Sequence, residues 1–174
     1  MVSGPTKPRA VLIGPPGSGK STIGRRLAKE LGVSWHDTDE AIAAGAGSSI
    51  SDIFVDHGEA HFRELEEQAV ERALLEHTGV LALGGGAVLS EATRRRLASH
   101  RVLYLEVGLT QASRRVGLNA AGRPLLLGNV RSQLKQMLDA RTPLYREVAD
   151  LTVNTDDLDV DAVVDAALDL LEQP

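Results

Sequence analysis

The sequence contains no cysteine, no long apolar segment and no excess of basic residues. Without cysteine, neither a disulfide framework nor a thiolate-ligated zinc site can form, which agrees with a reducing compartment. The first apolar run, Ala10 to Ile13, is far too short for a signal peptide or a membrane span. We therefore expect a soluble, cytoplasmic protein with no membrane partner.

The charge balance argues against a nucleic-acid partner. The chain has 19 Lys and Arg against 24 Asp and Glu, which gives a net charge of −5. General nucleic-acid binding needs a broad basic face, so an anionic ligand would have to be held by a local cluster of Arg and Lys. Because 43% of the 174 residues are hydrophobic and no repeat or linker interrupts them, we expect one domain over residues 1–174. We expect it to be a monomer.

A glycine-rich stretch, GPPGSGKS at residues 14–21, fits the phosphate-loop pattern G-x-x-x-x-G-K-[ST]. It follows the apolar run at 10–13, whose length suits a buried parallel strand, and precedes a helical pattern. The glycines allow a tight turn with inward N–H groups, and the helix adds its positive N-terminal end. Lys20 would reach the β- and γ-phosphates of a nucleotide, and Ser21 would bind the bridging Mg²⁺. The alternative, a glycine-rich turn with a chance lysine, leaves the flanking strand and helix unexplained.

Apolar periodicity predicts strands that alternate with helices, which is typical of an α/β domain. The predicted strands are 10–13, 33–36, 80–83, 102–107 and 150–153. The predicted helices are 21–31, 40–44, 50–57, 58–77 and 90–99, with three more that begin near 110, 130 and 160. We expect Trp35, the only tryptophan, to pack in the core.

Two short motifs stand at the ends of predicted strands. DTD at 37–39 follows the second strand, and GGG at 84–86 follows the third, at the edge where open α/β sheets bind ligands. Asp37 and Asp39 suit a metal-orienting carboxylate and one near an acceptor hydroxyl. The competing interpretation is that they cap the next helix. No Asp ends the third strand, so Asp37 is the candidate for the Mg²⁺ site, whereas the glycines bring backbone close to a neighbouring group.

Two side-chain pairs near residue 60 have simple alternatives. From spacing alone, Arg63 is best explained by an ion pair with Glu66 or Glu67, one turn away on the same helix. His57 and His61 are also one turn apart and could share a metal ion. No third ligand is placed nearby, so we do not expect a metal site there.

Two further arginines suit contacts with anions. Residues 117–129 are bracketed by glycines with Arg123 in the middle, which suits a flap that closes over a phosphate, although an ordinary surface loop is the alternative. Arg141 falls on the inner face of a helix that Pro143 should break. Such an arginine either snorkels outward or meets an anion in a cleft, and we favour the cleft.

Six motifs follow one another along nearly the whole chain: GSGKST at 17–22, DTD at 37–39, GE at 58–59 with FR at 62–63, GGG at 84–86, RPLL at 123–126 and R-x-PLY at 141–145. Together they resemble the shikimate kinase family. The resemblance implies a P-loop fold like that of nucleoside-monophosphate kinases, with a five-stranded parallel sheet flanked by helices and a flexible lid at about 117–129. It also implies transfer of the γ-phosphate of ATP to the 3-hydroxyl of shikimate, in the pathway to chorismate and aromatic amino acids.

The resemblance also implies roles for individual residues. The catalytic residues would be Lys20, Asp39 and Arg123. ATP would be bound by Gly17, Ser18, Gly19, Lys20, Ser21, Thr22, Arg115 and Arg123. Shikimate would be bound by Asp39, Arg63, Gly84, Gly85, Gly86 and Arg141. The Mg²⁺ ligands would be Ser21 and Asp37.

One departure from relatives concerns the adenine site. Arg115 is similar to a residue that stacks on adenine, but Val160 stands where some relatives have a proline, next to an acidic loop. Two alternative functions remain open: another small-molecule kinase on the same scaffold, and a nucleotide-dependent switch without an acceptor. A switch would need an Asn-Lys-x-Asp motif or a DNA-binding segment, and the sequence has neither.

Overall fold

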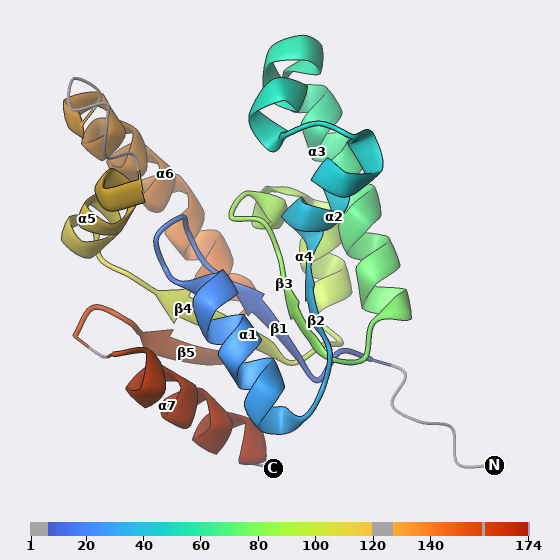
Figure 1. The fold of residues 1–174 in the computed structure, drawn as a ribbon, viewed down its shortest axis with the longest axis vertical. Helices are drawn as coiled ribbons and strands as arrows, with labels where there is room; N and C mark the ends of the chain where they lie inside the picture. The colour runs from blue at the N-terminus through green and yellow to red at the C-terminus, as the bar shows by residue number, and fades with distance from the viewer. Residues whose placement is uncertain (1–6, 120–126, 158, 174) are drawn as a thin grey trace.

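The structure, a computed structural model, describes residues 7–119, 127–157 and 159–173. Within these residues, five strands form one parallel sheet in the order β2-β3-β1-β4-β5 (Figure 1). Their bounds are β1 Ala10–Ile13, β2 Trp35–Asp37, β3 Val80–Ala82, β4 Val102–Glu106 and β5 Leu151–Asn154. The predicted five-stranded parallel sheet is confirmed.

The central strand, β1, lies where the strand order reverses. It pairs with β3 on one side and β4 on the other, so that Leu12 lies opposite Ala82 and Leu103. All four residues of β1 are buried, because helices cover both faces of the sheet. The loop that leaves β1 after Ile13 therefore opens at the switch point of the carboxyl edge, where open α/β sheets bind ligands.

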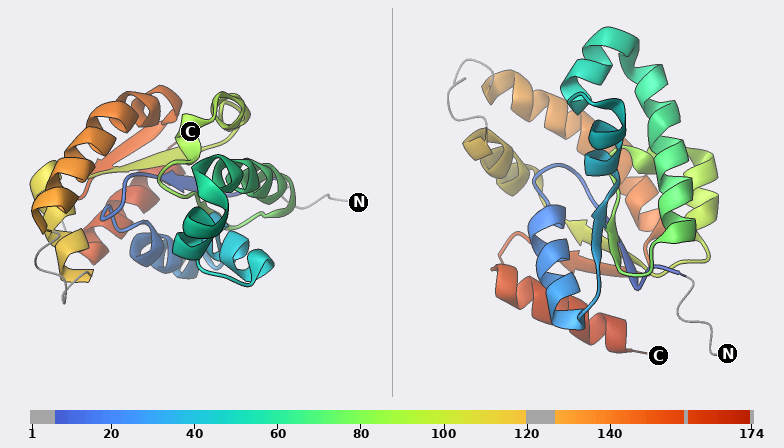
Figure 2. Two further views of the ribbon diagram at one scale, coloured as in Figure 1. Left: turned by 90° about the horizontal axis from the view of Figure 1, so that it is seen from above. Right: turned by 45° about the vertical axis from the view of Figure 1, so that its right-hand side comes forward.

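Helices cover both faces of the sheet and produce two separate cores (Figure 2). Their bounds are α1 Lys20–Leu31, α2 Thr38–Ala46, α3 Ile50–Glu76, α4 Glu91–Leu97, α5 Leu109–Asn119, α6 Leu127–Val148 and α7 Val160–Glu172, with a short 3-10 helix η1 at Ala87–Leu89. Successive strand residues point to opposite faces. Leu12 packs with residues of α1 and α7 on one face, whereas Val11 and Ile13 pack with residues of α3, α4 and α6 on the other. No helix in the described ranges combines the length and the apolar character that a membrane crossing needs.

The first half of α3 and the helix α2 form a small lobe that rises above the sheet in Figure 1. Its own buried cluster consists of Ile42, Ile53 and Phe62. At Gly58 the backbone leaves the helical conformation, with φ 85° and ψ 168°. The predicted boundary between helices at residue 58 is therefore confirmed as a kink, although the two segments form one element.

Some predicted boundaries were wrong. The second strand covers 35–37 rather than 33–36, and α2 already begins at Thr38 because the Asp37 side chain caps it. The break expected at Pro143 is absent, since α6 runs through this residue to Val148. Proline removes a single helical N–H, and the fully buried Tyr145 anchors the turn beyond it. Packing has overridden the local preference.

Trp35 takes the predicted core position. Its partly buried indole ring packs with the core between the sheet, α1 and α7. A Cβ atom at Gly24 of α1 would overlap this ring, so glycine is needed there for close approach of the helix to the strand.

Candidate active site

The loop at 14–19 joins β1 to α1 and has the backbone that its glycines predict. Gly17 and Gly19 have φ values of 81° and 87°, a left-handed conformation that other residues rarely adopt. The first turn of α1 has no side-chain cap. Its N–H groups are thus available to an anion, and the helix dipole favours negative charge at this end.

Lys20 reaches back over this loop from the first residue of α1. Its Nζ donates hydrogen bonds to the carbonyl oxygens of Gly14 at 2.5 Å and Pro15 at 3.2 Å. Burial lowers the pKa of Lys20 to about 8, and the nearby carboxylates of Asp39 and Asp37 oppose that shift. The ammonium group therefore lies within the loop, where the phosphates of a nucleotide would add the negative charge that favours its protonated form.

Asp37 caps a helix, which is one of the two roles that the sequence left open, and it also contacts Ser21. Its Oδ1 accepts hydrogen bonds from the N–H groups of Asp39 and Glu40 at 2.8 and 3.2 Å, which caps α2. Its Oδ2 accepts a hydrogen bond from the Ser21 hydroxyl at 3.5 Å. One carboxylate oxygen is thus fixed by the cap, while the other pairs with Ser21 beside the phosphate loop. These two hard oxygens fit Mg²⁺, which typically takes one or two protein ligands together with phosphates and water.

Asp39 lies near Lys20 and Gly84. Burial raises the pKa of Asp39, as does the negative charge of Asp37, whereas Lys20 and Arg63 act in the opposite direction. Its Oδ1 is buried and accepts no hydrogen bond from the part of the chain that the structure describes. A buried acceptor of this kind is ready for a ligand hydroxyl.

Glu66 is a buried carboxylate in this region that sequence reasoning treated only as an ion-pair partner. Its side chain is 4% exposed, and Oε1 accepts a hydrogen bond from Arg63 at 2.7 Å. Burial raises the pKa of Glu66, and the hydrogen bond from Arg63 opposes this. The signal was its helical position: Glu66 stands one turn after Phe62 and one turn before Val70, both of them buried.

Gly84 and Gly86 are explained by close approach, because neither of them has a positive φ. A Cβ at Gly84 would lie 2.5 Å from Oδ1 of Asp39 and 2.7 Å from Oε2 of Glu66. A Cβ at Gly86 would overlap the Arg63 guanidinium. The prediction that these glycines bring backbone close to something is confirmed, and the neighbours are charged side chains.

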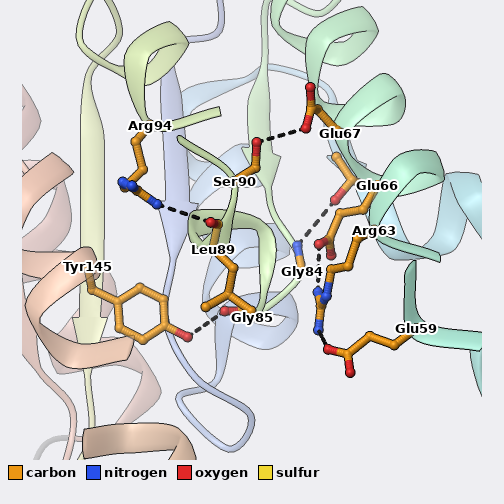
Figure 3. A network of polar contacts seen from close by, with 11 residues as sticks. Glu59, Arg63, Glu66, Glu67, Gly84, Gly85, Leu89, Ser90, Arg94 and Tyr145 are labelled. Carbon is orange, nitrogen blue, oxygen red and sulfur yellow. Dashed lines mark hydrogen bonds and ion pairs between the residues drawn. The ribbon is translucent and has the colours of Figure 1, made fainter. Parts of the chain in front are cut away.

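Two of the predicted arginines flank this glycine loop from different helices. Arg63 of α3 lies against Gly86, and Figure 3 shows its guanidinium between Glu66 and Glu59. Arg141 of α6 lies on another side, with its Nη1 3.5 Å from the position of a Cβ at Gly85. The ion pair predicted for Arg63 is confirmed, and the fold brings it to the same loop as Arg141. The contacts of Arg63 with Gly86 and of Arg141 with Gly85 could not be predicted from spacing along one helix.

Six of the residues predicted to bind ATP and both aspartates line one hollow of about 540 Å³, whereas Arg63 and Gly86 line a separate one of about 230 Å³. Its walls include residues of the phosphate loop, Asp37, Asp39, Gly85 and Arg115. The hollow therefore brings the phosphate loop, two carboxylates and the glycine loop to one place. Such a juxtaposition suits transfer of a phosphoryl group to a small acceptor.

A second hollow, of about 390 Å³, continues on the other side of the phosphate loop and contains both Arg115 and Val160. Arg115 is held by hydrogen bonds to the Gly17 carbonyl at 3.0 Å, to the Thr155 hydroxyl at 3.1 Å and to the Thr155 carbonyl at 2.6 Å. These bonds hold the planar guanidinium of Arg115 at the wall of this second hollow. A guanidinium plane of this kind can stack on a flat aromatic base.

Arg123, together with residues 120–126 of the predicted lid, lies outside the described residues. The roles predicted for that segment stay predictions. The rings of His57 and His61 lie with centroids 4.9 Å apart. No group of three or more potential metal-binding His, Asp or Glu residues occurs within the described ranges.

The match to known proteins extends over nearly the whole chain. The sequence model of the family "Shikimate kinase" matches residues 16–172. A shikimate kinase from Thermobifida fusca is 57% identical over 150 residues, which cover 86% of this chain and 87% of the relative. One from Saccharopolyspora erythraea is 55% identical over 91% of this chain and 90% of the relative.

Solved structures show the same relationship. The structure of a shikimate kinase from Acinetobacter baumannii in complex with shikimate matches with a TM-score of 0.86 and 34% identity, over 95% of this chain and 92% of that one. A shikimate kinase from Bacteroides thetaiotaomicron matches with a TM-score of 0.86 at 27% identity, over 94% of this chain and 98% of that one. Sequence, fold and the arrangement of the phosphate loop, paired carboxylates and flanking arginines lead to one conclusion: this chain belongs to the shikimate kinase family.

Proposed function

We propose that this chain transfers the γ-phosphoryl group of ATP to the 3-hydroxyl of shikimate, giving 3-phosphoshikimate and ADP on the route to chorismate and aromatic amino acids. Membership of the shikimate kinase family supports the reaction. The observation that carries it is the hollow of about 540 Å³ that joins the phosphate loop to Asp37, Asp39 and Gly85. This hollow brings the phosphate loop next to carboxylates that can bind the hydroxyls of a small acceptor.

ATP is held by the loop and by the start of α1. The N–H groups of residues 17–22 surround its phosphates, Lys20 contacts the β- and γ-phosphates, and Arg115 supports the adenine. Ser21 and Asp37 would hold Mg²⁺, because their oxygens lie together at 3.5 Å beside the loop. When bound, the ion neutralises charge on the phosphate oxygens.

Shikimate is held by cationic side chains at its carboxylate end and by an acidic side chain at its hydroxyl end. Its carboxylate binds the guanidinium groups of Arg63 and Arg141, which flank the glycine loop. Its ring hydroxyls bind Asp39, whose buried Oδ1 is open to a donor. A ring pinned at both ends presents one hydroxyl to the γ-phosphate, which is how a polyhydroxylated acid is phosphorylated at a single position.

In the reaction, the 3-hydroxyl oxygen bonds to the γ-phosphorus, the bond from that phosphorus to the β–γ bridging oxygen breaks, and ADP leaves. The hydroxyl proton passes to the Asp39 carboxylate, whose pKa burial raises and thereby makes a better base. Lys20, and Arg123 on the lid, stabilise the charge of the transferring group. Positioning contributes more than basicity, because the transition state of phosphoryl transfer is loose.

A coupled ADP-release assay tests the function. Purified protein with ATP and Mg²⁺ should release ADP quickly only after shikimate is added. Shikimate methyl ester is the matched control, because it keeps the hydroxyls but lacks the charge that the arginines bind. ADP release without any acceptor would indicate a nucleotide switch, and turnover of unrelated alcohols in preference to shikimate would indicate another small-molecule kinase.

We also propose that the protein acts as a cytoplasmic monomer. Light scattering coupled to gel filtration measures the mass directly, and cell fractionation measures the location.

A further inference from the structure

Tyr145 of α6 lies under the glycine loop and contacts it with its hydroxyl group. The side chain is fully buried, and its ring stacks on that of Tyr104 with centroids 5.0 Å apart. The hydroxyl donates a hydrogen bond to the carbonyl oxygen of Gly85 at 2.6 Å, and Figure 3 shows the phenol directed at the loop. Burial raises the pKa of Tyr145 to about 12, so the phenol keeps the proton that it donates.

Turn hydrogen bonds hold the two ends of the glycine loop, from the Ala87 N–H to the Gly84 carbonyl at 3.0 Å and from the Leu89 N–H to the Gly86 carbonyl at 3.1 Å, and two side chains add further anchors. Glycine has the largest conformational freedom of any residue, and three in a row can adopt many backbone arrangements. One anchor is the Gly84 N–H, which donates a hydrogen bond to the buried Thr38 hydroxyl at 3.2 Å. The other is the bond from Tyr145 to Gly85. These two contacts tie the loop to α2 and to α6.

The second anchor determines the orientation of one peptide group. No peptide bond in the described chain is cis, and in a planar trans peptide the carbonyl and the N–H point in opposite directions. The Gly85 carbonyl is directed at Tyr145, so the N–H of Gly86 in the same peptide group is directed away from α6. Gly86 is also the glycine against which the Arg63 guanidinium lies. The Gly86 N–H and the Arg63 guanidinium are therefore neighbouring donors on this loop.

Tyr145 is also linked to the other arginine. Arg141 stands one turn earlier on α6 and lies beside Gly85. The Tyr145 side chain thus connects the helix that carries Arg141 to the loop that Arg63 contacts. The ring of Tyr104 is equally buried but belongs to β4, and its hydroxyl lies beside Thr142 instead of the loop.

We propose that Tyr145 is a positioning residue for the phosphoryl acceptor: its hydroxyl holds the Gly85–Gly86 peptide and Arg141 in the arrangement that grips a small carboxylate. The inference rests on the proposed function, since it assigns the acceptor to this loop. It assigns no contact between Tyr145 and the acceptor itself.

The variant Tyr145→Phe removes the hydroxyl and keeps the ring, and Tyr104→Phe is the matched control on the stacked partner. We expect Tyr145→Phe to raise the KM for shikimate roughly five- to tenfold, the scale of one lost hydrogen bond. The KM for ATP should stay within about twofold, because the phosphate loop is untouched. Tyr104→Phe should leave both constants near those of the parent.

Hydrogen exchange of the free protein supplies a readout that needs no substrate. In Tyr145→Phe the amides of residues 84–87 should exchange faster than in the parent, whereas Tyr104→Phe should leave them unchanged. If shikimate supported no ADP release by the parent protein, the proposed function would fail, but the exchange rates would still show whether Tyr145 holds the loop.

A second measurement keeps Tyr145 in place, so that its result does not depend on whether the variant Tyr145→Phe folds. The chain has only two tyrosines, so in Tyr104→Phe grown with 3-fluorotyrosine the single ¹⁹F signal reports Tyr145. This signal should shift on addition of shikimate and change less on addition of ADP. An unchanged shikimate KM with unchanged exchange in Tyr145→Phe, equal effects of the two Phe variants, or a ¹⁹F signal indifferent to shikimate would each overturn the proposal.

Discussion

The carboxylates of Asp39 and Glu66 converge on the same glycine, Gly84, although they come from different helices. A Cβ there would lie 2.5 Å from one and 2.7 Å from the other. Burial raises the pKa of both carboxyl groups. Lys20 and Arg63 oppose the shift of Asp39, whereas Arg63 and Arg141 oppose that of Glu66. Glycine at position 84 is what allows two acidic groups and one arginine to share this space.

Asp39→Asn tests the stability cost of the raised pKa. A carboxyl group with a raised folded-state pKa binds more protons in the folded protein, so its ionisation destabilises the fold as the pH rises above 3.8. At pH 7.5 the neutral variant should therefore be more stable by about 0.5–2 kcal/mol, and the gain should shrink at pH 4.5. Its kcat should fall about 10²- to 10⁴-fold.

Urea denaturation at the two pH values measures the free energy of unfolding for the parent and for Asp39→Asn. A variant that is less stable than the parent at pH 7.5 would show that Asp39 stabilises the free protein, contrary to the direction of its pKa.

Glu66→Ala tests whether the buried partner orients Arg63. Without Glu66 the guanidinium loses its contact at 2.7 Å, so we expect about a tenfold rise in the KM for shikimate. The matched control is Glu59→Ala, because Glu59 pairs with the same arginine at 3.5 Å but is 64% exposed. Exposed pairs contribute little, and this variant should stay within about twofold of the parent. Equal effects of the two variants would mean that burial does not matter to the orientation of Arg63.

Lys20→Met tests the loop lysine. The variant should fold normally, while kcat falls by about 10²- to 10³-fold because a cation at the transferring phosphate is lost. Lys29→Met, at an exposed position on the same helix, is the control. Circular dichroism and the coupled assay together separate loss of fold from loss of chemistry. A Lys20→Met protein of near-normal rate would remove this lysine from the mechanism.

Arg63→Ala and Arg141→Ala test the carboxylate clamp. Each should weaken shikimate binding by about 1.5–3 kcal/mol, the scale of a charge-assisted hydrogen bond, and leave ATP binding unchanged. Arg146→Ala is the control, because Arg146 is on the same helix as Arg141 but is 64% exposed and pairs with Glu106. Calorimetric titration with each ligand gives the answer. Weaker ATP binding with intact shikimate binding would show that the clamp is assigned to the wrong ligand.

Arg115→Ala tests the nucleotide side. The variant loses the bonds that join α5 to Gly17 and Thr155, so ATP binding should weaken by about 1–3 kcal/mol while the KM for shikimate is kept. The neighbouring, exposed Arg114 provides the control as Arg114→Ala. A selective loss of shikimate affinity instead would place Arg115 at the acceptor.

Local patterns predicted most of the elements and part of the site. The apolar run at 10–13 and the glycines at 17 and 19 specify a strand and a left-handed turn through short-range sterics, and both are confirmed. Pro143 shows where such reasoning fails. Its missing N–H predicts a break, yet Tyr145, anchored against a loop 60 residues away in sequence, keeps the helix continuous.

In the site, too, some contacts follow from local sequence and others depend on tertiary packing. Asp37 was given two alternative roles because its neighbours in sequence suit capping, whereas the contact with Ser21 depends on the packing of α1 beside β2. For Arg63, helical spacing correctly predicted the pair with Glu66. That spacing contains no information on Gly86, which lies in the loop after β3.

The sequence by itself determined the phosphate loop, the parallel α/β order of elements and the set of charged residues available for a ligand. These follow from backbone sterics and apolar periodicity, which act over a few residues. Only the tertiary structure decided that Asp39, Glu66, Arg63, Arg141 and Tyr145 meet at three consecutive glycines. Contacts between side chains far apart in the chain depend on how the helices pack on the sheet, and burial, not sequence neighbourhood, sets the pKa of the carboxyl groups there.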